Sequence, residues 1–120
     1  MHEMHDFDGR LRELRAPLRE LRHHIPEAWD GFLQLAKHAE QDGAILARVK
    51  EAFTVAIAVT HGCEGCIAHH AKAAAKAGTT EQELAEALAV ALLMGGGPAS
   101  MYLPVAWAAY KEFREAASVG

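Results

Sequence analysis

Apolar residues recur at spacings of three and four along most of the chain, and this periodicity constrains the fold more than any other feature. The clearest run is Leu11, Leu14, Leu18, Leu21 and Ile25. Such a spacing places the side chains on one face of a helix. The alternation with a period of two that marks a half-buried strand occurs nowhere in the sequence. We therefore expect an all-α fold.

Capping and turn residues divide the chain into about six expected helices. Pro26 suits the first position of a helix, Gly78 suits the end of one, and Thr80 to Glu83 form a capping box. The expected helices cover roughly residues 11–25, 26–42, 44–60, 63–77, 81–94 and 98–116. We divide the chain into an N-terminal amphipathic helical extension (1–24) and a helical domain (25–120), and we expect residues 1–9 to be frayed.

The composition narrows the class of protein and its compartment. Apolar residues make up 51% of the chain but aromatics only 7%, so the core must consist mainly of Ala, Leu, Val and Ile. The net charge of -4 argues against nucleic acid or an anionic membrane as the main partner. The N-terminus lacks the pattern of a signal peptide and the apolar runs are too broken to span a bilayer, so we expect a cytoplasmic protein.

The stretch from Cys63 to His70 contains the only two cysteines of the chain, at C-x-x-C spacing. On a helix, Cys63, Cys66 and His70 fall within roughly 60° of one another. Gly62 precedes them, so the first cysteine should lie in the first turn, where the helix dipole stabilises a thiolate. A redox pair is favoured. Three other interpretations of the cysteines remain open: a zinc site that adds His69 or His70, a structural disulfide, or two cysteines that are simply buried in the core.

Glu51 is the last acidic residue before the cysteines and lies on the expected helix 44–60. It could be a surface acid beside Arg48 and Lys50. If the chain turns at Gly62, however, this helix folds back alongside the cysteine helix. A carboxylate in such an apolar setting has a raised pKa and can carry a proton.

Together these residues resemble the signature of the carboxymuconolactone decarboxylase superfamily, in its alkyl hydroperoxidase D-like branch. The signature residues are Glu51, Cys63, Cys66 and His70, and further matches are Ala77-Gly78-Thr79, Met94-Gly95-Gly96-Gly97-Pro98 and Met101-Tyr102. The resemblance extends over roughly residues 25–113.

The resemblance implies an all-helical domain that forms a homo-oligomer, commonly a trimer or a hexamer. It also implies a thiol peroxidase in which Cys66 attacks a hydroperoxide and becomes a sulfenic acid. Cys63 acts as proton donor and then closes a disulfide, while Glu51 and His70 relay protons. An external dithiol, in some members a lipoyl-bearing protein, reduces the disulfide. We expect no cofactor and no resident metal.

Some points stay open at this stage. The peroxidase prototype of this branch has a histidine at the position of Gly65. The helix dipole favours Cys63 as the more acidic thiol, whereas the family scheme makes Cys66 the nucleophile. One alternative function is a decarboxylase-like lyase that uses Glu51 and His70 as acid and base. Another is a non-catalytic helical protein whose cysteines bind metal or pack in the core.

Overall fold

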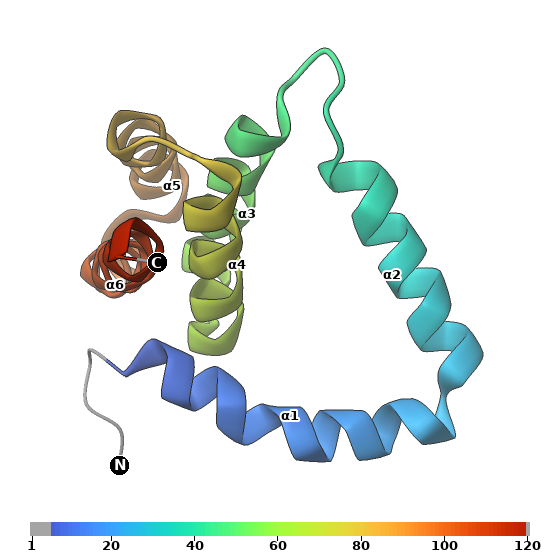
Figure 1. The fold of residues 1–120 in the computed structure, drawn as a ribbon. Coiled ribbons are helices and arrows are strands. Elements are labelled where there is room, and N and C mark those ends of the chain that lie inside the picture. Colours follow the sequence, from blue (N-terminus) through green and yellow to red (C-terminus); the bar gives the residue numbers. More distant parts are fainter. Residues whose placement is uncertain (1–5, 120) are drawn as a thin grey trace.

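The computed structural model describes residues 6–119, and this part of the chain forms helices and no strands (Figure 1). The helices are α1 (Phe7–His24), α2 (Pro26–Glu40), α3 (Ala47–His61), α4 (Glu64–Ala77), α5 (Glu81–Ser100) and α6 (Leu103–Val119). The expected all-α fold of about six helices is confirmed.

The four helices α3 to α6 form a bundle around an alanine-rich core. α3 packs against α4 and α5, and α4 packs against α6. Gly62 and Gly78 end α3 and α4 with φ of 64° and 86°, in the left-handed region that favours glycine. The largest fully buried side chains are Tyr110, Phe7, Ile67, Leu84, Val55, Val59 and Thr79.

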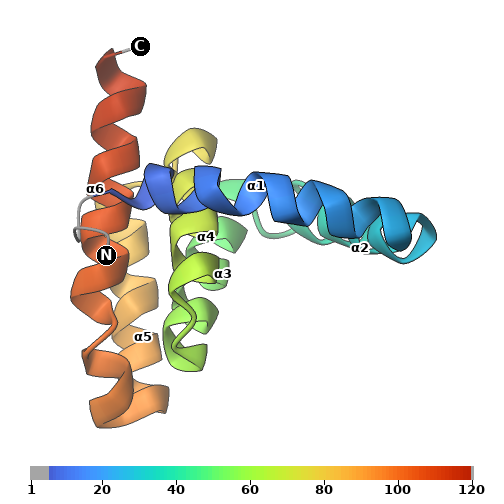
Figure 2. The ribbon, with the colours of Figure 1, turned by 90° about the horizontal axis from the view of Figure 1, so that it is seen from below.

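Helices α1 and α2 form an arm that extends away from this bundle (Figure 2). α1 crosses α4 near its own N-terminus, and none of the residues of α2 is buried. The arm also enlarges the molecule. The radius of gyration of the chain is 14.6 Å, whereas a compact chain of this length has a radius of gyration of about 13.6 Å. The leucine seam of α1 is exposed beyond its first turns, for example at Leu14 (54%) and Leu21 (51%).

The expectation that residues 1–9 are frayed is wrong for the part of that segment that the structure describes; residues 1–5 lie outside it. α1 begins at Phe7, whose side chain is fully buried in the core. The backbone N–H groups of Phe7 and Asp8 each donate to a carboxylate oxygen of Glu112 on α6, at 3.2 Å. The buried Phe7 side chain and the Glu112 carboxylate therefore fix the start of α1. The division at residue 24 remains a prediction.

Two helix starts differ from expectation for local reasons. α3 begins at Ala47 because Leu46 is extended (φ -69°, ψ 149°) and the Asp42 carboxylate accepts the Ala47 N–H at 2.7 Å. α5 is broken at Gly96 (φ 63°, ψ -149°), as the glycine run predicts. The chain resumes a helical turn after this break, so α6 begins only at Leu103.

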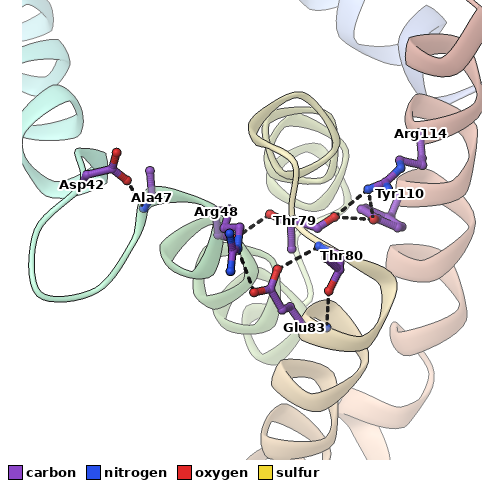
Figure 3. A network of polar contacts seen from close by, with 8 residues as sticks. All are labelled: Asp42, Ala47, Arg48, Thr79, Thr80, Glu83, Tyr110 and Arg114. Atoms are coloured by element: carbon purple, nitrogen blue, oxygen red, sulfur yellow. Dashed lines mark hydrogen bonds and ion pairs between the residues drawn. The ribbon is translucent and has the colours of Figure 1, made fainter.

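The loop between α4 and α5 is tied to two other helices through Thr79, which is fully buried (Figure 3). Its hydroxyl donates to the Arg48 carbonyl at 2.6 Å. Its own carbonyl accepts from the Tyr110 hydroxyl and from Arg114 Nη1 at 2.8 Å. Thr80 and Glu83 then form the expected capping box of α5. This network fixes α3, α4 and α6 relative to one another.

Membrane-spanning candidates are few in the described part of the chain. No single helix there combines the length and the hydropathy needed to cross a bilayer. Only a joined pair in this part of the chain, α5 with α6 up to Ala117, has the length and the composition that a membrane span needs. These two helices are bent by 110° at their junction.

We predict that Tyr110→Phe lowers the free energy of unfolding by about 1 kcal/mol, because it removes the hydroxyl from the Thr79 network. Urea unfolding measures the loss. Tyr102→Phe is the matched control, since the partly buried Tyr102 hydroxyl forms no hydrogen bond with any of residues 6–119. Equal losses in the two variants would contradict the stabilising role of the network.

Candidate active site

The turn at Gly62 places the helix of Glu51 beside the helix that carries Cys63, Cys66 and His70. The N–H groups of Gly62 and Cys63 donate to the carbonyls of Val59 (3.1 Å) and Ala58 (3.3 Å), which closes the end of α3. α4 then runs back along α3. The sequence-based expectation that α3 folds alongside the cysteine helix is confirmed.

Cys63 and Cys66 lie at the N-terminus of α4 and form a disulfide, with Cα atoms 5.3 Å apart. Cys63 is the N-cap rather than a residue of the first turn, and its Sγ accepts the N–H of Cys66 at 3.2 Å. Cys63 is partly buried, whereas Cys66 is exposed. A reduced Cys63 in this position would have its thiolate stabilised by the donated N–H and by the helix dipole.

Glu51 and His70 face each other across the α3–α4 interface. Only 5% of Glu51 is exposed, and its Oε2 lies 3.8 Å from His70 Nδ1. The Thr54 hydroxyl, one turn further along α3, lies 3.3 Å from the same Oε2. Nδ1 of His70 is shielded from solvent and has no hydrogen-bond partner among the described residues. A side-chain rotation that shortens the distance between Nδ1 and Oε2 by about 1 Å would join His70 and Glu51 in a direct hydrogen bond.

Burial moves the pKa values of these two groups toward each other. Desolvation raises the pKa of Glu51, and the negative charge of Glu40 raises it further. Desolvation lowers the pKa of His70, although Glu40 opposes that change. An acid with a raised pKa beside a base with a lowered pKa exchanges a proton at a small free-energy cost, as a proton relay requires.

Two further residues complete the surroundings. His69 is exposed and its ring contacts that of His70 edge-on, with centroids 4.9 Å apart. Glu40 ends α2, and its carboxylate lies in one cluster with Glu51 and His70, their ligand atoms all within 4.8 Å. Sequence reasoning missed Glu40, because no local spacing links the end of α2 to the cysteine helix.

The comparison with protein families agrees with this geometry. The sequence model of the carboxymuconolactone decarboxylase family matches residues 24–112. The chain belongs to this family. The family expected from the signature residues is therefore confirmed, and the cysteine pair is consistent with its alkyl hydroperoxidase D-like branch.

Similar proteins support the assignment. An uncharacterised protein of Cupriavidus necator is 40% identical over 97 residues, which is 81% of this chain and 86% of that protein. A family member from Legionella pneumophila has a solved structure with a TM-score of 0.85 and 38% identity, covering 90% of this chain and 96% of its own. A Thermotoga maritima member matches with a TM-score of 0.78 and 25% identity over 92% and 95% of the two chains. That Thermotoga protein is described with a suggested role in an antioxidative response.

We predict that Glu51→Gln stabilises the protein at about pH 7 and not at about pH 4. The folded-state pKa of Glu51 is raised, so its contribution to stability is present at low pH and is lost as the pH rises through that pKa. Removing the charge restores this contribution at neutral pH. Urea unfolding at both pH values checks the effect. Glu27→Gln on exposed α2 is the charge control, and an equal gain there would contradict the burial argument.

Proposed function

We propose that this family member is a thiol-dependent peroxidase and disulfide oxidoreductase that reduces hydroperoxides through Cys63 and Cys66. The observation that carries the proposal is a disulfide at the N-terminus of α4 together with the pair formed by His70 of the same helix and the buried Glu51 of α3. The role suggested for the similar Thermotoga maritima protein points the same way.

The reaction would proceed in two balanced steps. The Cys66 thiolate attacks the distal peroxide oxygen, the O–O bond breaks, and the alkoxide leaves and takes the proton of the Cys63 thiol. Cys66 becomes a sulfenic acid. The resulting Cys63 thiolate attacks the sulfenic sulfur, the S–O bond breaks, and the hydroxide leaves as water with the proton that the relay took from Cys66, which closes the disulfide. An external dithiol, for which a lipoyl-bearing protein is our candidate, returns the two electrons.

The different exposure of the two cysteines supports this division of roles. Cys66 is exposed, so a peroxide can reach its sulfur. His70 lies four residues further along the same helix, within reach of the same face. The half-buried Cys63 accepts an N–H at the helix N-terminus, which favours the thiolate that resolves a sulfenic acid on its neighbour.

The relay would consist of Glu51 and His70. His70, neutral because burial lowers its pKa, accepts the thiol proton and passes it to Glu51. No histidine follows Cys63 within the C-x-x-C motif, where this chain has Gly65. A Cβ built on Gly65 meets no atom within 4 Å, so the structure leaves room for a Cβ at this position.

We further propose that the protein works as a homo-oligomer, a trimer or a hexamer. α2 buries none of its residues in the single chain, and its apolar face includes Phe32 (55% exposed) and Leu35 (64%). α5 similarly exposes Leu93 (79%) and Met94 (77%). Apolar surfaces of this extent are typical of interfaces between subunits.

We predict that Cys66→Ser abolishes thiol oxidation when one equivalent of an organic hydroperoxide is added to the reduced protein. Cys63→Ser should still react and accumulate a sulfenic acid, which a dimedone-type reagent traps, because no resolving thiol remains. Intact mass and free-thiol titration follow both variants. Glu51→Gln and His70→Gln should slow the oxidation at least about tenfold.

Reduced wild-type protein whose thiols oxidise only at the rate of free cysteine would contradict the peroxidase proposal. Unchanged rates in both relay variants would contradict the relay alone. A lactone-decarboxylating activity that survives replacement of both cysteines by serine would favour the decarboxylase-like alternative instead.

We predict that Leu35→Glu dissociates the oligomer, because it places a charge on the exposed apolar face of α2. Light scattering coupled to size exclusion measures the mass. Gln34→Glu adds the same charge on the polar side of α2 and should leave the assembly intact. A wild-type protein that is monomeric at micromolar concentration would rule out the oligomer.

A further inference from the structure

The cluster of Glu40, Glu51 and His70 combines three potential ligands from three different helices. One ligand atom of each side chain lies within 4.8 Å of the others. We propose that these residues form a binding site for a divalent cation of the zinc type, separate from the cysteines. Glu51 is buried, whereas Glu40 and His70 are partly exposed. An ion can therefore enter from the solvent side.

The position of Glu40 is fixed by the loop that follows it. The ammonium of Lys50 donates to the Gln41 carbonyl at 2.7 Å. The Asp42 carboxylate accepts the N–H of Ala47 at 2.7 Å (Figure 3). Both bonds tie the end of α2 to the start of α3. These bonds hold the backbone of Glu40 near α3, so the short distance between Glu40 and Glu51 does not depend on the side-chain rotamer of Glu40 alone.

The charge at this place favours a cation. Glu40 lies at the C-terminus of α2, where the helix dipole is negative. Within residues 6–119, neither Glu40 nor Glu51 forms an ion pair with a lysine or an arginine. The ammonium of Lys50, on α3, donates to the Gln41 carbonyl instead.

A second, independent observation comes from the imidazole. Nδ1 of His70 is shielded from solvent, has no hydrogen-bond partner in the described part of the chain and lies 3.8 Å from Glu51 Oε2. A buried nitrogen that points at a carboxylate without bonding to it is suited to share a cation with that carboxylate. The Thr54 hydroxyl, 3.3 Å from Glu51 Oε2, would orient this ligand from outside the coordination sphere.

The donor set selects the type of ion. One imidazole and two carboxylates suit Zn²⁺ better than Mg²⁺ or Ca²⁺, which prefer oxygen alone. Bonds of about 2.0 to 2.1 Å place tetrahedral ligands roughly 3.4 Å apart. Modest side-chain rotations close the observed separations to that value. Three protein ligands leave the fourth position open to solvent.

The site has a consequence for the reaction, and this step rests on the proposed function. A cation bound by Glu51 and His70 occupies the groups that would carry the proton away from the thiol. Cation binding and the proton relay are then mutually exclusive. Zn²⁺ should act as a reversible inhibitor that needs neither sulfur.

The first experiment tests binding without any turnover. The full chain is kept in its disulfide form, so that the cysteines cannot bind metal, and is stripped with a chelator and titrated with Zn²⁺ by calorimetry. We expect one ion per chain and at least about tenfold weaker binding in Glu40→Gln. Glu27→Gln, also on α2, should bind like the wild type. His70→Gln provides a second ligand variant, and circular dichroism checks that each variant is folded.

No stoichiometric binding, equal affinity in Glu40→Gln, or binding that appears only after the cysteines are reduced would each overturn the site. A second experiment addresses inhibition. Zn²⁺ should slow peroxide-driven thiol oxidation in the wild type and much less in Glu40→Gln. Failure of the peroxidase reaction itself would appear without Zn²⁺ and would leave the calorimetric result to decide the site.

Discussion

The reversal of the chain at Gly62 is the constraint on which the rest of the site depends. Its φ of 64° is costly for any residue with a Cβ, and a Cβ built there would lie 3.2 Å from the Tyr102 ring. This one turn places Cys63 at the N-cap of α4 and returns α4 along α3. It therefore produces both the stabilised sulfur and the encounter of Glu51 with His70.

Much of this arrangement could be predicted because it depends on local signals. Gly62 and Gly78 end their helices where the sequence indicates, and the break after Met94 lies within the glycine run. Helix periodicity placed His70 on the face of the cysteines. The sequence left open whether Glu51 is a surface acid or a buried carboxylate with a raised pKa, and the return of α4 along α3 decides for the second.

The remaining features depend on contacts between residues that are distant in the sequence. Phe7 is an isolated aromatic residue after a polar terminus, and only the packing of α1 on α4 and the bond from its N–H to Glu112 of α6 make it part of the core. Glu40 reaches the site because side chains of α3 and of the loop hold the end of α2. The apolar stripe of α2 correctly indicated a helix, but periodicity does not reveal whether the surface it packs on belongs to the same chain.

The alanine content of α4 connects the core to the chemistry. Ala68, Ala71 and Ala74 are fully buried there, and Ala52 of α3 is almost so. Small side chains allow two helices to approach closely, so a glutamate on one and a histidine on the other come within 3.8 Å of each other. The same close packing removes water from the carboxylate and raises its pKa. In a core built from larger residues the two helices would stand further apart, and Glu51 would be more solvated and less suited to exchange a proton with a neutral imidazole.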